Sequence, residues 1–419
     1  MTDILHLSTF LRRPIFDTDG DRIGRVQDLV ARLGDDAHPP IVGVVFRIEN
    51  RDLFIPIDKV DGLSEGRVTL SGPLVDLRRF ERRAGELLLA EDLLSRHLIN
   101  LGRGRLIIAN EIEIAQVDGR WEVVGVDPGR RRVLRRLFGA AHESSELTAS
   151  IVDFASIQPF VSHVPTARLR IPYRKLARLH PAQIADLVEH ASHEEGEEII
   201  EAVGLDRELE ADVFEELDTT HQLEFLESRS DSDAARLLSR MEPDNAADLI
   251  TEVVQDRRLP ILDLLPSEQQ AKVRQLLTYH ADTAGGLMNP DFVSVSVAAT
   301  VADALDAIRS SSVPAESLQA VFVLDASAQP VGAAPIASLV RARASGLAID
   351  AARTPLAHVH PHWHVLRVSR MMSDFNLTVL PVLDDAHGVM VGVVTVDDLL
   401  EELLPQGWRA EFGVSAVEE

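Results

Sequence analysis

The 419-residue chain has no cysteine, few aromatic residues and no long apolar run. Without cysteine it can form neither a disulfide nor a thiolate metal site, and it has no cysteine nucleophile. No segment approaches the ~20 consecutive apolar residues that span a bilayer. The first residues, MTDILHLSTFLRRPIFD, are interrupted by charge and lack the apolar core of a secretory signal. These absences favour a cytoplasmic protein.

Positive charge is also scarce. The net charge of −25 argues against a nucleic-acid partner, because neutralising phosphates needs basic patches. Between Pro181 and Pro260 the chain has 23 Asp or Glu but 6 Arg and no Lys, while two short basic runs occupy 77–83 and 129–136. An acidic block of this kind can be an ordinary solvated surface, or it can bind hard cations such as Mg²⁺ through several carboxylates.

The chain is too long for a single core, and its texture changes along its length. We predict a multi-domain α+β protein that combines small β-barrels, an all-α superhelix and a tandem of α/β units. The predicted parts are a small barrel (1–80), a helical connector with a second barrel-like unit (81–171), an acidic superhelix (172–281), the α/β tandem (282–410) and a tail (411–419).

Residues 8–75 read as short strands separated by Gly/Asp-rich turns, which is typical of a small barrel. Within them, IVGVVFRIENRDLFIPIDKV predicts a hairpin that turns at ENRD. Residues 98–162 repeat this pattern with a longer insertion. Between the two copies, apolar residues at helical spacing over 75–99 predict one or two helices.

Two further patterns follow. Short helices are predicted over 180–191, 242–254 and 265–277, and such helices should stack as a coil. Residues 292–405 then hold an internal duplication, in which each copy reads strand, helix, strand, turn, strand, helix. Neither copy can bury its sheet alone, so the two should pack together.

The first strand-rich segment resembles PRC-barrel domains. The residues that carry the likeness are RRPIFDTDGDRIGRVQDLV and LFIPIDKV, and the second copy matches less well. That family consists mostly of binding and docking modules, so the resemblance implies a docking role and no chemistry.

The tandem resembles a CBS-domain pair, most specifically at VGVVTVDDL, where Gly392, Thr395 and Asp398 fit an adenosine-phosphate motif. The resemblance implies that Asp398 binds ribose hydroxyls and Thr395 contacts phosphate of ATP or AMP, and that the pair forms a homodimer. Thr395 and Asp398 equally fit a helix capping box with no ligand. The first copy has Pro335 and Ser338 at the positions of Thr395 and Asp398, so at most one of the two clefts has the residues for nucleotide binding.

The region 172–405 resembles the cytosolic half of the MgtE family of magnesium channels, through RLHPAQIADLVEHA, EPDNAADLI and YHADTAGGLMNPDFVSV. In that family a membrane domain follows the CBS pair, whereas here residues 405–419 follow Leu404. The expectation is therefore a cytoplasmic regulator that does not itself conduct ions. A separately encoded membrane protein is the partner that would hold it peripheral to the inner membrane.

The same resemblance implies that Mg²⁺ binds between the superhelix and the CBS pair and draws them together. The candidate metal ligands are Asp244 and Asp248 on the helical side, and Asp384, Asp385, Asp397 and Asp398 on the second CBS copy. Asp244 and Asp248 share one helical face at i and i+4. Taken singly, each of these carboxylates also fits a solvated or capping position.

Two features fall outside this picture. HVHPHWHV places His358, His360, His362 and His364 at alternate positions, so that an extended segment would project them to one side. Such a cluster could bind Ni²⁺, Co²⁺ or Zn²⁺, or be an exposed loop. Gly285 and Gly286 stand at the boundary between superhelix and tandem, where we expect a left-handed helix stop that serves as a hinge.

The sequence shows no catalytic constellation, and we predict that the protein is not an enzyme. Three functional classes stay open: a Mg²⁺ sensor connected with magnesium transport, an adenine-nucleotide sensor, and a docking scaffold.

Overall fold

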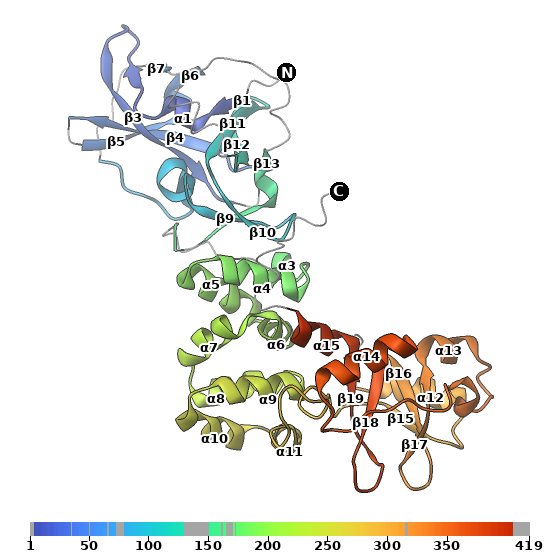
Figure 1. The fold of residues 1–419 in the computed structure, drawn as a ribbon. Helices are drawn as coiled ribbons and strands as arrows, with labels where there is room; N and C mark the ends of the chain where they lie inside the picture. The colour runs from blue at the N-terminus through green and yellow to red at the C-terminus, as the bar shows by residue number, and fades with distance from the viewer. Residues whose placement is uncertain are drawn as a thin grey trace. The chain divides into compact units, whose positions relative to one another are not determined.

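The computed structural model describes residues 4–34, 36–49, 51–64, 67–72, 79–129, 151–160, 162–164, 171, 173–314 and 317–404. The chain forms two compact units, Met1–Leu217 and Asp218–Glu419 (Figure 1). The boundary divides the predicted superhelix between the units. The predicted tail 411–419 and all but the first residue of the basic run 129–136 lie outside the described residues.

The first unit is built on three sheets. The first copy of the repeat contains β1 (Ile4–His6), α1 (Leu7–Phe10), β2 (Pro14–Phe16), β3 (Arg22–Arg32), β4 (Ile41–Ile48), β5 (Arg51–Pro56), η1 (Ile57–Lys59), β6 (Val60–Ser64) and β7 (Arg67–Leu70). The second contains β8 (Glu86–Leu88), η2 (Leu89–Leu93), β9 (His97–Asn100), β10 (Arg105–Ile108), β11 (Glu111–Val117), β12 (Arg120–Asp127), β13 (Val152–Asp153), η4 (Phe154–Ser156) and β14 (Ile157–Pro159). The predicted hairpin is confirmed, since β4 and β5 pair antiparallel with Ile48 opposite Arg51.

The two copies exchange their first strands. Strand β1 pairs with β11 of the second copy, while β8 pairs with β3 of the first. Two carboxylates at corresponding positions support the exchange: Asp28 accepts the backbone N–H of Ala90 at 2.8 Å, and Glu111 accepts that of Ser8 at 3.0 Å. One apolar core contains residues of both copies. The predicted boundary at residue 80 therefore does not separate two independent bodies.

One structural prediction for this unit is wrong, and another is not confirmed. The segment 75–99 was expected to be helical, but its described part forms β8, the single π-helical turn η2 and the start of β9. Its apolar residues are buried because β8 pairs with β3 and η2 packs beside them. The apolar spacing in the sequence does not distinguish this arrangement from a buried helix. The barrel prediction is not confirmed, because the described strands form open sheets in the orders β5-β4-β3-β2-β7-β6, β1-β11-β12-β13 and β10-β9-β14.

Helices follow from α3 (Tyr173–Leu176) onward. The first unit also contains α4 (Pro181–His190), α5 (His193–Val203) and α6 (Arg207–Glu216). The second unit begins with α7 (Thr219–Glu227), α8 (Asp231–Leu238), α9 (Pro243–Glu252), α10 (Gln255–Leu264) and α11 (Ser267–Leu276). In the second unit alternate helices pack together, α7 on α9, α8 on α10 and α9 on α11, as expected of a coil of short helices.

Side chains tie these helices together at their ends. Arg257 of α10 donates to Asp231 of α8 and to the carbonyl oxygens of Leu226 and Arg229. Gln269 donates its amide to the carbonyls of Leu238 and Met241, at 3.3 and 3.0 Å, and thus satisfies acceptors at and just after the end of α8.

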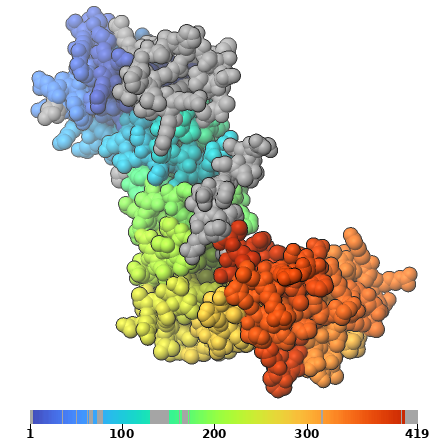
Figure 2. All heavy atoms as spheres, viewed as in Figure 1, coloured from blue at the N-terminus to red at the C-terminus, as the bar shows by residue number. Residues whose placement is uncertain are grey.

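The remainder of the second unit confirms the predicted tandem. The first copy contains β15 (Ser294–Ser296), α12 (Val301–Ser310), β16 (Ala320–Leu324), β17 (Pro330–Pro335), α13 (Ile336–Arg341) and η5 (Ala348–Ala351). The second contains α14 (Val365–Phe375), β18 (Val379–Leu383), β19 (Met390–Thr395) and α15 (Val396–Leu403), and its short first strand is reduced to a parallel bridge between Val359 and Val382. Figure 2 shows this tandem in orange and red beside the yellow helices of the same unit.

The glycine pair is required by close packing and not by a left-handed backbone. Neither Gly285 nor Gly286 has a positive φ, so the expected left-handed helix stop is wrong. A Cβ on Gly286 would lie 2.4 Å from the carbonyl oxygen of His280, and one on Gly285 would lie 2.6 Å from the Tyr279 ring. The N–H of Gly285 also donates to Pro361 at 2.8 Å. A hinge at this point would have to break these contacts.

Candidate functional site

The second unit brings carboxylates from α9 and α15 together at the junction of the helices and the tandem. Asp244, in the first turn of α9, is 6% exposed, and its Oδ1 has no hydrogen-bond partner within the described part of the chain. Burial, and then the negative charges of Asp398 and Glu242, raise the pKa of Asp244 well above its ordinary value. This group of three carboxylates, Glu242, Asp244 and Asp398, is called the junction cluster below.

Direct polar contacts hold the same junction. Glu242, just before α9, accepts hydrogen bonds from Asn289 Nδ2 at 2.7 Å and from Ser317 Oγ at 2.8 Å. Asn289 follows the glycine pair, and its backbone exchanges hydrogen bonds of 2.8 and 2.9 Å with Val393 of β19. The loop before α9 is thereby joined both to the linker and, through it, to the second copy of the tandem.

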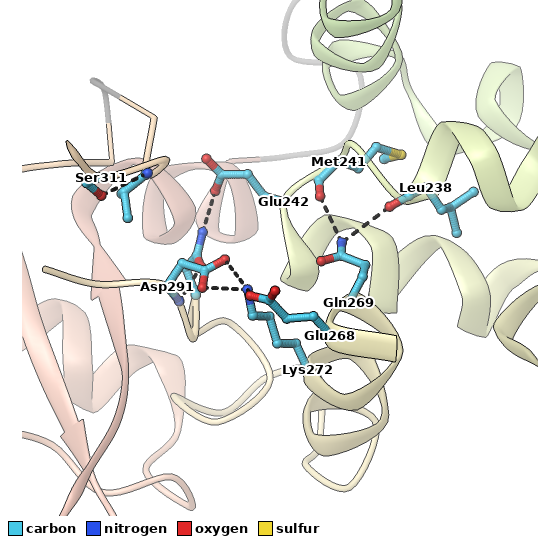
Figure 3. Close-up of polar contacts among 10 residues, drawn as sticks. Leu238, Met241, Glu242, Glu268, Gln269, Lys272, Asp291 and Ser311 are labelled. Atoms are coloured by element: carbon cyan, nitrogen blue, oxygen red, sulfur yellow. Dashed lines mark hydrogen bonds and ion pairs between the residues drawn. The ribbon is translucent and has the colours of Figure 1, made fainter. Parts of the chain in front are cut away.

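A lysine strengthens the junction from α11. Figure 3 shows Lys272 extending toward Asp291, with Glu268 beside it. The Nζ atom lies 2.8 Å from Asp291 Oδ1 and 2.9 Å from Glu268 Oε1. Since the Lys272 side chain is 24% exposed, solvent screens its ion pair with Asp291 less than it screens an ion pair on the open surface.

The predicted metal ligands occupy different settings. The structure brings Asp244 and Asp398 together but leaves Asp248, one turn later on α9, exposed. Asp397 is exposed in the first turn of α15. Asp384 accepts the N–H of Val389 at 2.7 Å within the β18–β19 turn. Asp385, in the same turn, contacts His360 and His362.

The predicted nucleotide residues Thr395 and Asp398 form a capping box. Thr395 donates its N–H to Asp398 Oδ2 at 2.8 Å, and Asp398 returns its N–H to Thr395 Oγ1 at 3.4 Å. Gly392 is needed for packing, because a Cβ there would lie 2.9 Å from Met288 Sδ and from the carbonyl oxygen of Asn289. These contacts account for all three residues without a ligand, and the capping alternative is the arrangement present.

Sequence reasoning missed Glu242, Asn289, Ser317 and Lys272. Glu242 and Asn289 lie within EPDNAADLI and TAGGLMNP, the stretches that carried the resemblance, so their position offered a signal. Ser317 had none, because its partner Glu242 is distant in the sequence, and for Lys272 the sequence offered the i,i+4 pair with Glu268 but not the contact with Asp291.

Comparison with protein families matches two segments of the chain. Residues 179–282 match the MgtE intracellular N domain, and residues 348–405 match the CBS domain. The chain carries an MgtE intracellular N domain followed by a CBS domain. The matched N domain begins near α4 and ends just before the glycine pair.

Curated relatives point the same way. The chain is 34% identical over 141 residues to the magnesium transporter MgtE of Thermus thermophilus, which is 34% of this chain and 31% of that protein. It is 26% identical over 193 residues to MgtE of Bacillus subtilis, covering 46% of this chain and 43% of the relative. The chain thus spans less than half the length of these relatives.

Solved structures extend the likeness to the fold. The cytosolic domain of the Mg²⁺ channel MgtE in complex with ATP aligns with a TM-score of 0.51 at 28% identity, over 55% of this chain and 93% of that chain. The soluble part of a magnesium transporter aligns with the same TM-score at 25% identity, over 55% and 89%. The MgtE N domain and CBS tandem are therefore homologous to MgtE cytosolic domains. Among the described residues, no helix is long and apolar enough to cross a membrane.

Proposed function

We propose that this protein is a non-catalytic, cytoplasmic regulator connected with magnesium transport, in which Mg²⁺ binds at the junction cluster and closes the MgtE N domain onto the CBS tandem. The observation that carries the proposal is the buried Asp244 beside Asp398 and Glu242. The homology to MgtE cytosolic domains supports it.

The carboxylates of the junction cluster are the type of oxygen ligand that a hard cation prefers. Three carboxylates that approach one another repel, and a divalent ion with part of its water shell offsets that repulsion. Asp244 Oδ1, which has no hydrogen-bond partner among the described residues, is an acceptor whose burial costs free energy when nothing binds to it. Because Asp244 belongs to α9 and Asp398 to α15, one ion held by both would stabilise the closed arrangement.

A titration of the full chain with Mg²⁺ tests the proposal. Small-angle scattering in EDTA and then in millimolar Mg²⁺ should show a smaller radius of gyration with the ion, and calorimetry should show binding. Asp244→Asn should raise the Mg²⁺ concentration needed for both responses at least tenfold. Asp248→Asn is the matched control, because it removes one charge from an exposed position on the same helix. An equal loss in both variants, or an unchanged radius in the wild type, would exclude the mechanism.

An adenine nucleotide is the second candidate ligand. The solved relative that contains ATP, together with the motif residues Gly392, Thr395 and Asp398, favours it. Calorimetry with ATP and AMP should then show binding that Asp398→Ala abolishes and Asp244→Asn leaves intact. No heat with either nucleotide would leave the ion-sensor function ahead.

A homodimer through the CBS tandem and a membrane partner complete the proposal. Exposed apolar side chains support the first: Leu366 and Phe375 on α14 are 62% and 63% exposed, and Leu400 on α15 is 50% exposed. A second copy packed against α14 and α15 would cover apolar side chains of this kind. Light scattering of the wild type and of Leu366→Ser/Phe375→Ser should show a dimer and a monomer. Co-purification of the chain with membranes would identify a transporter partner, and retention through the first unit alone would instead favour a docking scaffold.

A further inference from the structure

The single lysine of the second unit, Lys272, reaches across the linker between α11 and the tandem (Figure 3). Its Nζ atom lies 2.8 Å from Asp291 Oδ1 and 3.0 Å from Asp291 Oδ2, so that one ammonium group contacts both oxygens of the carboxylate. Glu268, one turn earlier on α11, supplies a third oxygen at 2.9 Å. The three N–H donors of an ammonium group match these three oxygens. The ammonium group therefore occupies the place of a cation between two carboxylates.

Lys272 keeps its positive charge in this setting. Burial lowers the pKa of the ammonium group, but its hydrogen bonds to Asp291 and Glu268 outweigh burial and raise the pKa above the ordinary value for lysine. The Asp291 side chain is 36% exposed, against 82% for Glu268. The contact with Asp291 is thus the more sheltered of the two, and it is the one that joins the helices to the linker.

Asp291 is itself fixed to the tandem. Its N–H donates to Asn289 Oδ1 at 2.9 Å, and Asn289 is buried. The backbone of Asn289 exchanges hydrogen bonds with Val393 of β19. A carboxylate that is already positioned loses little conformational freedom when it forms an ion pair. The pair of Lys272 and Asp291 should therefore stabilise more than an exposed pair of two free side chains.

This ion pair spans the glycine pair. Lys272 and Asp291 are 19 residues apart in the sequence, with Gly285 and Gly286 between them. A movement that takes α11 away from the tandem has to break the contact between Nζ and the Asp291 carboxylate. Lys272 thus acts on the same closure as a cation shared by α9 and α15, but it is part of the chain and needs no free ion.

We propose that Lys272 is a built-in cation that sets the Mg²⁺ concentration at which the MgtE N domain closes onto the CBS tandem. The inference rests on the proposed closure at the junction cluster. When a ligand binds one of two states, its apparent dissociation constant is the intrinsic value divided by the fraction of protein in that state. The pair of Lys272 and Asp291 raises the closed fraction, and it therefore lowers the Mg²⁺ concentration needed for closure.

Lys272→Gln in the full chain tests the proposal, because it removes the charge and keeps a polar side chain. Calorimetry and small-angle scattering should both give a Mg²⁺ midpoint about threefold higher than in the wild type. Lys272→Arg keeps the charge and a fork that fits both Asp291 oxygens, so its midpoint should stay close to that of the wild type. Asp291→Asn removes the pair from the other side and should shift the midpoint as Lys272→Gln does. The double variant should add no further shift.

The ammonium group can also be observed directly. The chain has three lysines, so selective labelling of lysine gives few NMR signals. The Lys272 signal, assigned by its loss in Lys272→Gln, should show slower hydrogen exchange of its N–H donors as Mg²⁺ is added, with the same midpoint as closure. Exchange that does not respond while the radius changes would overturn the proposal, because the pair would then form equally in the open and closed arrangements.

Arg274→Gln is the matched control. Arg274 lies on the same helix, and its guanidinium contacts Asp263 of α10 at 2.8 Å, so the variant removes one positive charge without touching the linker. Its Mg²⁺ midpoint should equal that of the wild type. An equal rise in Arg274→Gln would overturn the proposal by assigning the effect to net charge. So would a lower midpoint in Lys272→Gln, which would show that the ammonium group repels Mg²⁺ more than it favours closure.

The wild type separates this inference from the proposed function. A wild type that responds to Mg²⁺ with the same midpoint as Lys272→Gln would overturn the role of Lys272 and leave the proposed function standing. A wild type that neither binds Mg²⁺ nor changes its radius would overturn both. Circular dichroism of each variant should match the wild type, and Asp291→Asn carries the test if Lys272→Gln does not fold.

Discussion

Asn289 donates a 2.7 Å hydrogen bond from Nδ2 to Glu242 Oε2, and this contact joins the linker after the glycine pair to the residue that precedes α9. The other Glu242 oxygen accepts the hydroxyl of Ser317 at 2.8 Å. These contacts join the residue before α9 to the linker and to Ser317 in the closed arrangement, which a cation at Asp244 would stabilise further.

Asn289→Ala should destabilise the second unit by about 2–3 kcal/mol. The side chain is 2% exposed, and alanine removes both its bond to Glu242 and the bond that its Oδ1 accepts from the Asp291 N–H at 2.9 Å. Urea unfolding, monitored by hydrogen exchange of the backbone amides in 218–404, measures the change in the free energy of unfolding. Gln275→Ala, at an exposed position of α11, should stay within about 0.5 kcal/mol of the wild type. Equal stability of the two variants would show that the hydrogen bonds of Asn289 do not stabilise the junction.

Gly286→Ala should cost about 1–3 kcal/mol, because its Cβ would lie 2.4 Å from a backbone oxygen that has to move. Thermal unfolding of the full chain provides the measurement. Gly34→Ala is the control, since nothing lies within 4 Å of a Cβ there and its φ is not positive. A Gly286→Ala protein as stable as the control would show that the glycine is needed for motion and not for packing.

Mg²⁺ binding, if it occurs at the junction cluster, should weaken as pH falls. Burial and the nearby carboxylates raise the pKa of Asp244, so protons compete with Mg²⁺ for this carboxylate at higher pH than they would for an ordinary aspartate. Below that pKa the affinity should drop by up to about tenfold per pH unit. Calorimetry in buffers of different ionisation enthalpy measures the released proton. Asp244→Asn should release none, and proton release by that variant would assign the effect to another group.

The stability of the first unit should decrease as pH rises from about 4 to about 7. Burial raises the pKa of Asp28 to about 7, against the opposing backbone hydrogen bonds from Ala90, Glu91 and Leu29. The folded state therefore binds more protons than the unfolded state in this window, and stability present below the unfolded pKa is lost as pH rises through the folded pKa. The full effect is about 4 kcal/mol, at about 1.4 kcal/mol per unit.

Hydrogen exchange within β3 and η2 at several pH values measures this slope. Asp28→Asn should flatten it, because the substituted side chain does not titrate. Asp118→Asn is the matched control: it removes an exposed aspartate at a turn with φ 48°, a conformation that asparagine tolerates. A slope that persists in Asp28→Asn would assign the pH dependence to another group of this unit.

Local patterns predicted the helices and the tandem well. Pro181 and Pro243 begin α4 and α9 as their sequences indicate, because proline at the first helical position lacks only a hydrogen bond that the helix does not need there. The strand–helix–strand–strand–helix order of each CBS copy also followed from short-range periodicity. By contrast, the apolar stretch around Leu89 satisfies a helical period equally well, and pairing with β3 decided its structure.

The sequence by itself determined the short helices, the CBS tandem and the residue types available for cations. Only the tertiary structure decided which strands exchange between the two copies of the first unit, because the partner of an edge strand depends on contacts far apart in the chain. It also selected Asp244 over Asp248, since burial and the approach of Asp398 distinguish two aspartates one turn apart. Likewise the glycine pair is explained by the space beside Tyr279 and His280 and not by its backbone angles.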